Sequence, residues 1–371
     1  MAAAVLVLVV VASRIDLGYY ALTPGQAQPV GPLVKVPPAR AHPIHGPVLL
    51  TDVYESRVTL LSYLPDRLNG DAQLVPATAV LGSDTPPDEL TAQGYLEMAQ
   101  AQASAKAAAF RRLSYRVPAR QDGTLVMGVA AGSPASPALR VGQIVRAVDG
   151  VATPGVCAFE RALEPHGPGD VVKLSVERST VTDRAVIEPG PTVVERVRLG
   201  RTPPSQRDQA ASGCPGVASP SRGHLGVEVT TNVAYRYPFP VGIDTSQIGG
   251  PSAGLAMTLT IIDKLYGGDV TGGRTVAATG TIDPLGYVGP VGGVPQKTVA
   301  VERAGATAFL VPPAEYRTAE AKAVPSLHVY PVATLAQALS VLHRLGGEVP
   351  PRPSAAGAAG PAAPAAAAGP G

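Results

Sequence analysis

The sequence lacks the residue patterns that mark metal-binding and nucleic-acid-binding proteins. Only two cysteines occur, Cys157 and Cys214, and neither has the spacing to another cysteine or histidine that a zinc site requires. The 30 Lys and Arg residues nearly balance the 28 Asp and Glu residues, which leaves a net charge of +2 and no basic stripe. We therefore expect neither a structural metal nor a nucleic-acid partner. The cysteine count leaves open whether Cys157 and Cys214 pair or lie apart as buried thiols.

The N-terminus lacks an uninterrupted apolar stretch of membrane-spanning length. The run Ala2–Ala12 is shorter than the roughly 20 residues that a spanning helix needs. If the helix continues through Leu22, the length suffices, and Tyr19 and Tyr20 then lie where interfacial aromatic residues occur. No Lys or Arg precedes the run and no clear cleavage site follows, which favours an anchor over a signal peptide. We predict a single-pass anchor in the cell membrane over residues 1–22, with the rest of the chain outside the cytoplasm; a buried core helix is the alternative.

The remaining chain divides by composition, and its 371 residues exceed one typical core. A helical pattern runs from Asp88 to Phe110, whereas the next segment alternates like a small β domain. We predict an N-terminal α/β region (23–113), a β domain (114–199), a Pro/Ser/Gly-rich linker (200–222), a last folded domain (223–347) and a disordered Pro/Ala/Gly tail (348–371).

The β domain resembles a PDZ domain. The resemblance rests on Gly132-Ser133-Pro134-Ala135, on Leu139 to Val145, and on Ala147-Val148-Asp149-Gly150. Gln143 stands where bacterial PDZ domains commonly have Asp, a departure that leaves the fold expected. PDZ domains add an extended peptide end to a sheet edge, so the resemblance implies substrate capture or gating, with the peptide-lining strand near Leu113–Val117. A spacer domain without a ligand is the alternative.

The segment Gly249-Gly250-Pro251-Ser252-Ala253-Gly254 opens an apolar run that stops at Gly267-Gly268. The run predicts a buried helix ended by glycine, which places Ser252 at or beside the helix N-terminus. Free backbone N–H groups there can hold an oxyanion, and Gly249 and Gly250 let a carbonyl approach closely. Taken alone, the segment also fits a capped turn with a structural serine.

Lys297 is the candidate base for this serine. The pattern predicts a short helix over residues 296–304 with Lys297 in its first turn, where the helix dipole disfavours a cation. Burial would lower the lysine pKa further, and a lysine base must be neutral to accept a proton. Thr279 could hydrogen-bond the amine and direct it. The alternative is an ordinary solvated lysine.

Thr279-Gly280-Thr281-Ile282, followed by Gly292-Gly293 and Lys297, resembles the proteolytic domain of Lon peptidases, as does the Gly-Pro-Ser-Ala-Gly segment. The resemblance implies an α+β fold in which Ser252 is the nucleophile, Lys297 is the base and Thr279 supports the lysine, with no metal or organic cofactor. Gly249, Gly250 and Ser252 would supply the oxyanion N–H groups. Many Lon proteases have an acidic residue where Gly249 stands, but Lon-like relatives with Ile-Gly-Gly-Pro-Ser-Ala-Gly lack it too.

The order of segments resembles membrane-anchored, PDZ-containing Lon-like peptidases of bacteria, an α+β multidomain architecture. The sequence contains no G-x-x-x-x-G-K-[ST] phosphate loop. We therefore expect an ATP-independent serine endopeptidase that cleaves unfolded or flexible polypeptides outside the cytoplasm. The PDZ-like domain would bind a peptide C-terminus, and a homo-oligomer is plausible because Lon-like domains often form rings.

Two other functions fit parts of the sequence. Gly250-Pro251-Ser252-Ala253-Gly254 satisfies the nucleophile elbow of α/β-hydrolases, and Asp283 followed by His328 or His343 gives that fold's chain order. That elbow needs a strand running directly into the serine, and residues 244–251 make a poor strand. The second possibility is a PDZ adaptor in which the Lon-like domain is only a scaffold.

Overall fold

The computed structural model describes residues 2–77, 87–202, 214 and 223–351, which fold into two compact units. Among these residues, unit 1 contains 2–77, 97–115 and 237–351, and unit 2 contains 87–96, 116–202, 214 and 223–236. The predicted helix near residues 88–110 forms as α4 (Pro87–Arg112), which contributes residues to both units. The mixed α+β class expected from the sequence is confirmed.

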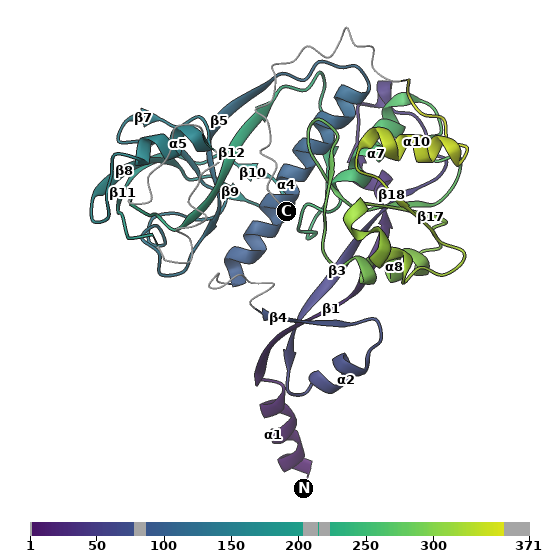
Figure 1. Cartoon of the computed structure of the whole chain (residues 1–371), viewed down its shortest axis with the longest axis horizontal. Coiled ribbons are helices and arrows are strands. Elements are labelled where there is room, and N and C mark those ends of the chain that lie inside the picture. The colour runs from purple at the N-terminus through teal and green to yellow at the C-terminus, as the bar shows by residue number, and fades with distance from the viewer. Residues whose placement is uncertain (1, 78–86, 203–213, 215–222, 352–371) are drawn as a thin grey trace. The chain divides into compact units, whose positions relative to one another are not determined.

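Unit 1 is built on a six-stranded mixed sheet in the order β18-β17-β14-β3-β1-β4. Strand β14 pairs in parallel with β3 and β17, β17 pairs in parallel with β18, and β1 runs antiparallel between β3 and β4. The long strands β1 and β3 lie side by side (Figure 1). The strands are β1 (Asp16–Pro29), β3 (Val48–Thr59), β4 (Gln73–Pro76), β14 (Val276–Ala278), β17 (Ala308–Val311) and β18 (His328–Pro331).

The helices of unit 1 cover this sheet through apolar residues. Both β14 and β17 are buried along their whole length, as expected for parallel strands covered on both faces. One core cluster joins Leu49 of β3 and Phe309 of β17 to Val294 and Val301. The remaining elements are α1 (Ala2–Ala12), β2 (Val34–Lys35), α2 (Tyr63–Leu68), β13 (Gly242–Ile243), α7 (Gly254–Tyr266), β15 (Thr281–Ile282), β16 (Val288–Gly289), α8 (Val294–Arg303), α9 (Tyr316–Glu320), α10 (Leu335–Arg344) and three short 3-10 turns (Gly31–Leu33, Pro38–Arg40, Pro313–Glu315).

The predicted membrane anchor over residues 1–22 is wrong. Helix α1 stops at Ala12, and the chain enters strand β1 at Asp16. Tyr19, Tyr20 and Leu22 lie in that strand and pair with residues of β3. Within the described part of the chain, every helix is too short or too polar to cross a membrane. The predicted location as a single-pass membrane protein, which rested on this segment, is therefore not supported. The physical reason is the polar break at Ser13, Arg14 and Asp16, beyond which the aromatic residues Tyr19 and Tyr20 favour a strand.

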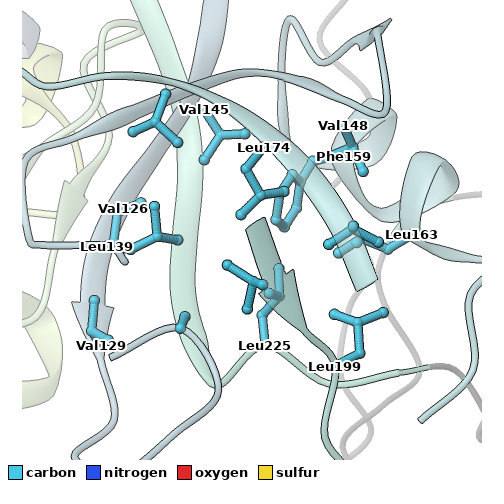
Figure 2. Close-up of a cluster of buried hydrophobic side chains, with 14 residues drawn as sticks. Val126, Val129, Leu139, Val145, Val148, Phe159, Leu163, Leu174, Leu199 and Leu225 are labelled. Atoms are coloured by element: carbon cyan, nitrogen blue, oxygen red, sulfur yellow. The ribbon is translucent and has the colours of Figure 1, made fainter. Parts of the chain in front are cut away.

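Unit 2 is an antiparallel β structure in the strand order β11-β8-β6-β5-β12, with β7 paired to β6. Its core gathers side chains of the sheet and of α5, among them Val126, Phe159 and Leu174, together with Leu139 from the segment between β5 and β6 (Figure 2). Its elements are β5 (Ala119–Val129), β6 (Ile144–Val148), β7 (Val151–Ala152), α5 (Val156–Leu163), β8 (Val171–Glu177), β9 (Thr180–Val181), β10 (Ile187–Glu188), β11 (Thr192–Arg198) and β12 (Val227–Tyr235).

Strand β12 was not expected in unit 2. Sequence analysis placed residues from 223 onward in the last folded domain and a peptide-lining strand near Leu113–Val117. The structure instead has no strand at residues 113–117, and β12 pairs with β5 from Val227↔Val129 to Tyr235↔Ala119. Leu225, just before β12, is buried in the core of unit 2, which draws this segment into that sheet.

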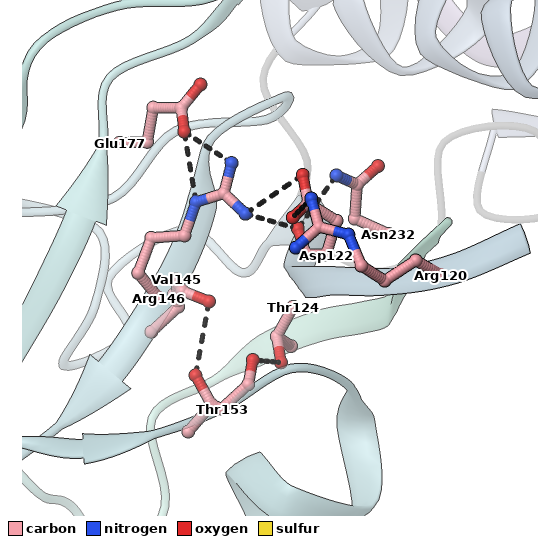
Figure 3. Close-up of polar contacts among 8 residues, drawn as sticks. All are labelled: Arg120, Asp122, Thr124, Val145, Arg146, Thr153, Glu177 and Asn232. Carbon is pink, nitrogen blue, oxygen red and sulfur yellow. Dashed lines mark hydrogen bonds and ion pairs between the residues drawn. The ribbon is translucent and has the colours of Figure 1, made fainter. Parts of the chain in front are cut away.

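Polar contacts tie the strands of unit 2 together (Figure 3). Arg146 of β6 donates from Nε to Glu177 Oε2 of β8 at 3.0 Å and forms an ion pair with Asp122 of β5. Asn232 Nδ2 of β12 donates to the Asp122 carbonyl at 2.9 Å. The contacts of Arg146 join β6 to β8 and to β5, and the bond from Asn232 joins β12 to β5.

Cys157 of α5 and Cys214 form a disulfide, with 5.3 Å between their Cα atoms. This answers the question that composition left open. Apart from residues 200–202 and 214, the predicted linker (200–222) lies outside the described residues, as does the predicted tail (348–371) after residue 351.

Candidate active site

Ser252 lies in the turn immediately before α7. The helix begins at Gly254 with Ala253 at its N-cap, so Ser252 is beside the helix N-terminus. The Ser252 carbonyl accepts hydrogen bonds from Gly280 N at 2.9 Å and from Thr279 Oγ1 at 3.3 Å. Leu255 N in turn donates to the Gly280 carbonyl at 3.1 Å. The serine turn is therefore fastened to the segment that follows β14.

The turn also presents backbone donors. In the described structure the N–H groups of Gly249, Gly250 and Ser252 donate to no other protein group. Unsatisfied N–H groups beside a helix N-terminus favour a negatively charged oxygen, as does the helix dipole. The three residues that sequence analysis named for an oxyanion thus carry N–H groups available for one.

Lys297 lies in the first turn of α8. Its backbone N–H donates to the Gly293 carbonyl at 3.0 Å, and its side chain is 3% exposed. Its Nζ donates to Thr279 Oγ1 at 3.4 Å. The lysine is therefore a buried side chain, unlike an ordinary solvated helix lysine.

Burial lowers the pKa of Lys297 from 10.5 to about 8. Three carboxylates, those of Asp52, Glu315 and Glu55, oppose this shift because they stabilise the ammonium form. Desolvation exceeds their combined effect, so a substantial fraction of the amine is neutral near pH 8. A neutral amine can accept a proton from a hydroxyl.

Thr279 joins the serine and the lysine. It is fully buried at the end of β14, and its hydroxyl accepts from Lys297 Nζ while donating to the Ser252 carbonyl. No direct hydrogen bond links Ser252 Oγ to Lys297 Nζ among the described contacts. Such bonds are often long before substrate binds and tighten in the reacting complex. The structure thus brings Ser252, Thr279 and Lys297 into one hydrogen-bonded chain.

The acidic neighbours of Lys297 were missed by sequence analysis. Asp52 and Glu55 lie on β3, and Glu315 follows β17, where its Oε1 accepts from Val291 N at 3.4 Å. No local motif connects β3 with α8, because the two meet only through tertiary packing. One indirect signal existed in Gly293, where a Cβ would lie 2.7 Å from Val53 Cγ1 of β3.

The alternative triad residues are not brought together. Asp283 Oδ1 accepts from Leu285 N and Tyr287 N within the turn between β15 and β16. His328 begins the strand β18 with its side chain exposed, and His343 Nδ1 lies 3.1 Å from the Gly347 carbonyl. Across the described residues, no hydrogen bond or ion pair joins either histidine to Ser252 or Asp283.

The nucleophile elbow is absent as well. The nearest preceding strand, β13, ends at Ile243, and turns occupy the residues between it and Ser252. The sharp strand-to-helix turn of α/β-hydrolases therefore does not form at this serine.

Residues 240–342 match the family described as the Lon protease (S16) C-terminal proteolytic domain. The chain is 44% identical over 62 residues to the Lon protease of Chloroflexus aggregans, a match that covers 17% of this chain and 7% of that protein. It is 34% identical over 95 residues to the Lon protease of Escherichia coli K12, covering 25% of this chain and 12% of that protein. The chain thus spans only a small part of the length of these relatives.

Among solved structures, the chain is similar to the PDZ domain of an SdrC-like protein from Listeria monocytogenes. The sequence identity is 18% and the TM-score is 0.21, over 29% of this chain and 87% of that one. A likeness at that score does not bear on the fold of unit 2.

Proposed function

We propose that unit 1 is a serine-type endopeptidase in which Ser252 is the nucleophile and Lys297 the general base. The observation that carries the proposal is the buried, pKa-lowered amine of Lys297, which Thr279 links to the turn of Ser252. The match of residues 240–342 to the Lon proteolytic domain supports the same reaction class.

The proposed reaction is acyl transfer in two steps. The neutral amine of Lys297 takes the hydroxyl proton of Ser252, and the oxygen attacks the carbonyl carbon of a peptide bond. The N–H groups of Gly249, Gly250 and Ser252 stabilise the oxyanion of the tetrahedral intermediate. Lys297 then gives its proton to the leaving amine. Water, activated by the same lysine, hydrolyses the acyl-enzyme and releases the second product.

We include independence from ATP in this proposal. Peptide hydrolysis by a serine and a lysine consumes only water, and each proton taken by Lys297 is returned to a product or to Ser252. Because no unfolding step is then coupled to the chemistry, suitable substrates are polypeptides that are already unfolded or flexible.

Unit 2 has a sheet edge suited to holding such a polypeptide. Strand β12 pairs with β5 on one side, and no described strand pairs with its other side in this sheet. An edge strand offers unpaired N–H and C=O groups to which an extended peptide can add. We propose that β12 captures extended peptide ends, the role that the resemblance to PDZ domains implied.

The test is cleavage of a peptide library by the full chain without ATP, followed by mass spectrometry. Ser252→Ala and Lys297→Ala should abolish cleavage, whereas His328→Ala should retain it; circular dichroism checks that each variant folds. Retained cleavage in Ser252→Ala would overturn the proposal, and loss in a folded His328→Ala variant would revive the esterase-type triad. An inactive unmodified chain would leave the adaptor function. Light scattering of the same sample tests the homo-oligomer that the Lon resemblance implied.

A further inference from the structure

Two segments that meet at Ser252 share one support, the part of α4 that lies in unit 1. Gln102 Nε2 of α4 donates to Thr245 Oγ1 at 2.9 Å, seven residues before Ser252. Arg111 Nη1 of α4 donates to the Pro284 carbonyl at 2.8 Å, shortly after the Gly280 N–H that holds the Ser252 carbonyl. The helix therefore contacts both the segment that leads into Ser252 and the segment that lies against it.

The segment between β13 and α7 has little secondary structure to hold its own path. Within it, Ile248 N donates to the Thr245 carbonyl at 2.8 Å, which closes a single turn. Gln247 has a φ of +65° and Gly250 a φ of +83°, and the left-handed conformation is costly for Gln247 because it carries a Cβ. Such a path persists only when its surroundings fix it, and Thr245 provides a buried anchor near its start.

That anchor is sealed from water. Thr245 is 1% exposed and Gln102 is 5% exposed, so neither polar group can replace its partner with solvent. Breaking a buried hydrogen bond from one side leaves the other group unsatisfied. The Gln102–Thr245 bond therefore confines Thr245 more firmly than a surface contact could.

The supporting helix is itself immobilised in unit 1. Phe110 of α4 contacts the rings of Tyr237 and Phe239 with centroids 5.8 and 4.9 Å away, and Tyr237 Oη donates to the Ala103 carbonyl at 2.9 Å. Ala103 is the residue next to Gln102. The amide of Gln102 thus projects from a fixed part of the helix.

We propose that Gln102 is a positioning residue that, through its buried bond to Thr245, sets the path of residues 245–252 and so the location of the Ser252 hydroxyl relative to Lys297. This inference rests on the proposed function of Ser252 as nucleophile. No described hydrogen bond joins Gln102 to Ser252 or Lys297, so it acts through the segment that it anchors.

The test measures the full chain with Gln102→Ala and Thr245→Val. Each should lower kcat by about 10- to 100-fold with little change in KM, because a displacement of about 1 Å at the nucleophile costs rates of that order. Thr245→Ser keeps the hydroxyl and should keep most of the rate. The double variant should lose no more than either single variant, because both break the same bond.

A matched control variant and a second measurement distinguish a positioning role of Gln102 from a role in stability alone. Thr260→Val removes a hydroxyl that is also 1% exposed, from α7, where Thr260 Oγ1 donates only to the Ala256 carbonyl. It should lower the melting temperature by a similar amount while leaving kcat per folded molecule unchanged. The pH at which the rate of Gln102→Ala inflects should equal that of the unmodified chain, since the surroundings of Lys297 are intact.

Amide hydrogen exchange gives a readout that does not depend on activity. The N–H of Ile248, which donates to the Thr245 carbonyl, should exchange faster in Gln102→Ala than in the unmodified chain, whereas exchange in α8 stays unchanged. Unchanged exchange of the Ile248 N–H, or full kcat in a folded Gln102→Ala variant, overturns the inference. Failure of the proposed function has a different signature, namely cleavage that survives Ser252→Ala.

Discussion

The rate at which Ser252 is acylated should rise with pH and level off above an inflection near pH 8. The shift of the Lys297 pKa from 10.5 to about 8 corresponds to about 3 kcal/mol in favour of the neutral amine. Because the side chain is only 3% exposed, solvent screens little of this effect. At pH 7 about one lysine in ten is then neutral, roughly 300-fold more than for an unperturbed lysine.

The same shift has a consequence for folding. The folded chain binds the Lys297 proton less tightly than the unfolded chain, so burying this lysine destabilises the protein below about pH 8. The penalty falls as pH rises from about 8 towards 10.5, where the unfolded lysine also loses its proton. Lys297→Met should therefore abolish acylation and yet raise the melting temperature at pH 7.

The carboxylates near Lys297 set the direction of a second shift. Glu315 raises the lysine pKa, so Glu315→Gln should move the inflection to lower pH while its amide oxygen can still accept from Val291 N. Glu55→Gln should act in the same direction, but less, because Glu55 is exposed and screened by salt.

The assay is the second-order rate of labelling by a fluorophosphonate, measured from about pH 6 to about pH 10, together with kcat/KM for an unfolded substrate, since both report on the free enzyme. An inflection near pH 10, or a rate that does not depend on pH, would refute the reasoning. A labelling profile unchanged by Lys297→Ala would show that another group activates the serine.

Three other perturbations test the structure away from the base. Asp263, 1% exposed, has a pKa raised by burial from 3.8 to about 6, so its stabilising contribution is complete below about pH 3.8 and is lost as pH rises through about 6. Asp263→Asn should therefore raise the free energy of unfolding at pH 8 by up to about 3 kcal/mol, with a higher melting temperature, and should leave both unchanged at pH 4. Gly254→Ala places a Cβ 2.9 Å from Ile282 N, so β15 must move away from the first turn of α7, and labelling of Ser252 should slow about 100-fold. The disulfide joins residues 57 apart, so the double variant Cys157→Ser, Cys214→Ser should lose about 4 kcal/mol of unfolding free energy from the loss of loop closure. Its urea midpoint should be lower than that of the unmodified chain and should not change when a reductant is added.

The elements that carry the two site motifs were predictable from short stretches of sequence. The apolar run after Ser252 and the glycines that end it predict α7, and the structure ends that helix at Gly267 with a φ of +81°. Helix α8 begins at Val294, two residues before the predicted start, because Pro295 is tolerated in a first turn, where its missing N–H has no helical acceptor. The catalytic roles of Ser252 and Lys297 stay predictions.

The prediction of a membrane anchor was wrong because it joined two apolar stretches, before and after a polar break, into one helix. Ala2–Ala12 is apolar throughout, but Arg14 and Asp16 separate it from Tyr19 and Leu22. Composition gave no sign that this second part pairs with a strand later in the chain, as Leu22 does with Glu55, 33 residues further on. Strand pairing at that distance depends on which edge is open in the folded sheet, and periodicity does not encode it.

Residues far apart in the sequence affect the candidate site, although the residues proposed to react lie close together in the sequence. Ser252, Thr279 and Lys297 come from one stretch of sequence, but the charges that act on the lysine come from β3 and from Glu315, and the anchor of the serine segment comes from α4. Strand β14, which leads into Thr279, is held in parallel between β3 and β17, so the position of Thr279 depends on a strand far outside the matched residues 240–342. A motif can therefore point to candidate reacting groups, whereas the pKa of Lys297 and the placement of these groups also depend on β3, β17 and α4.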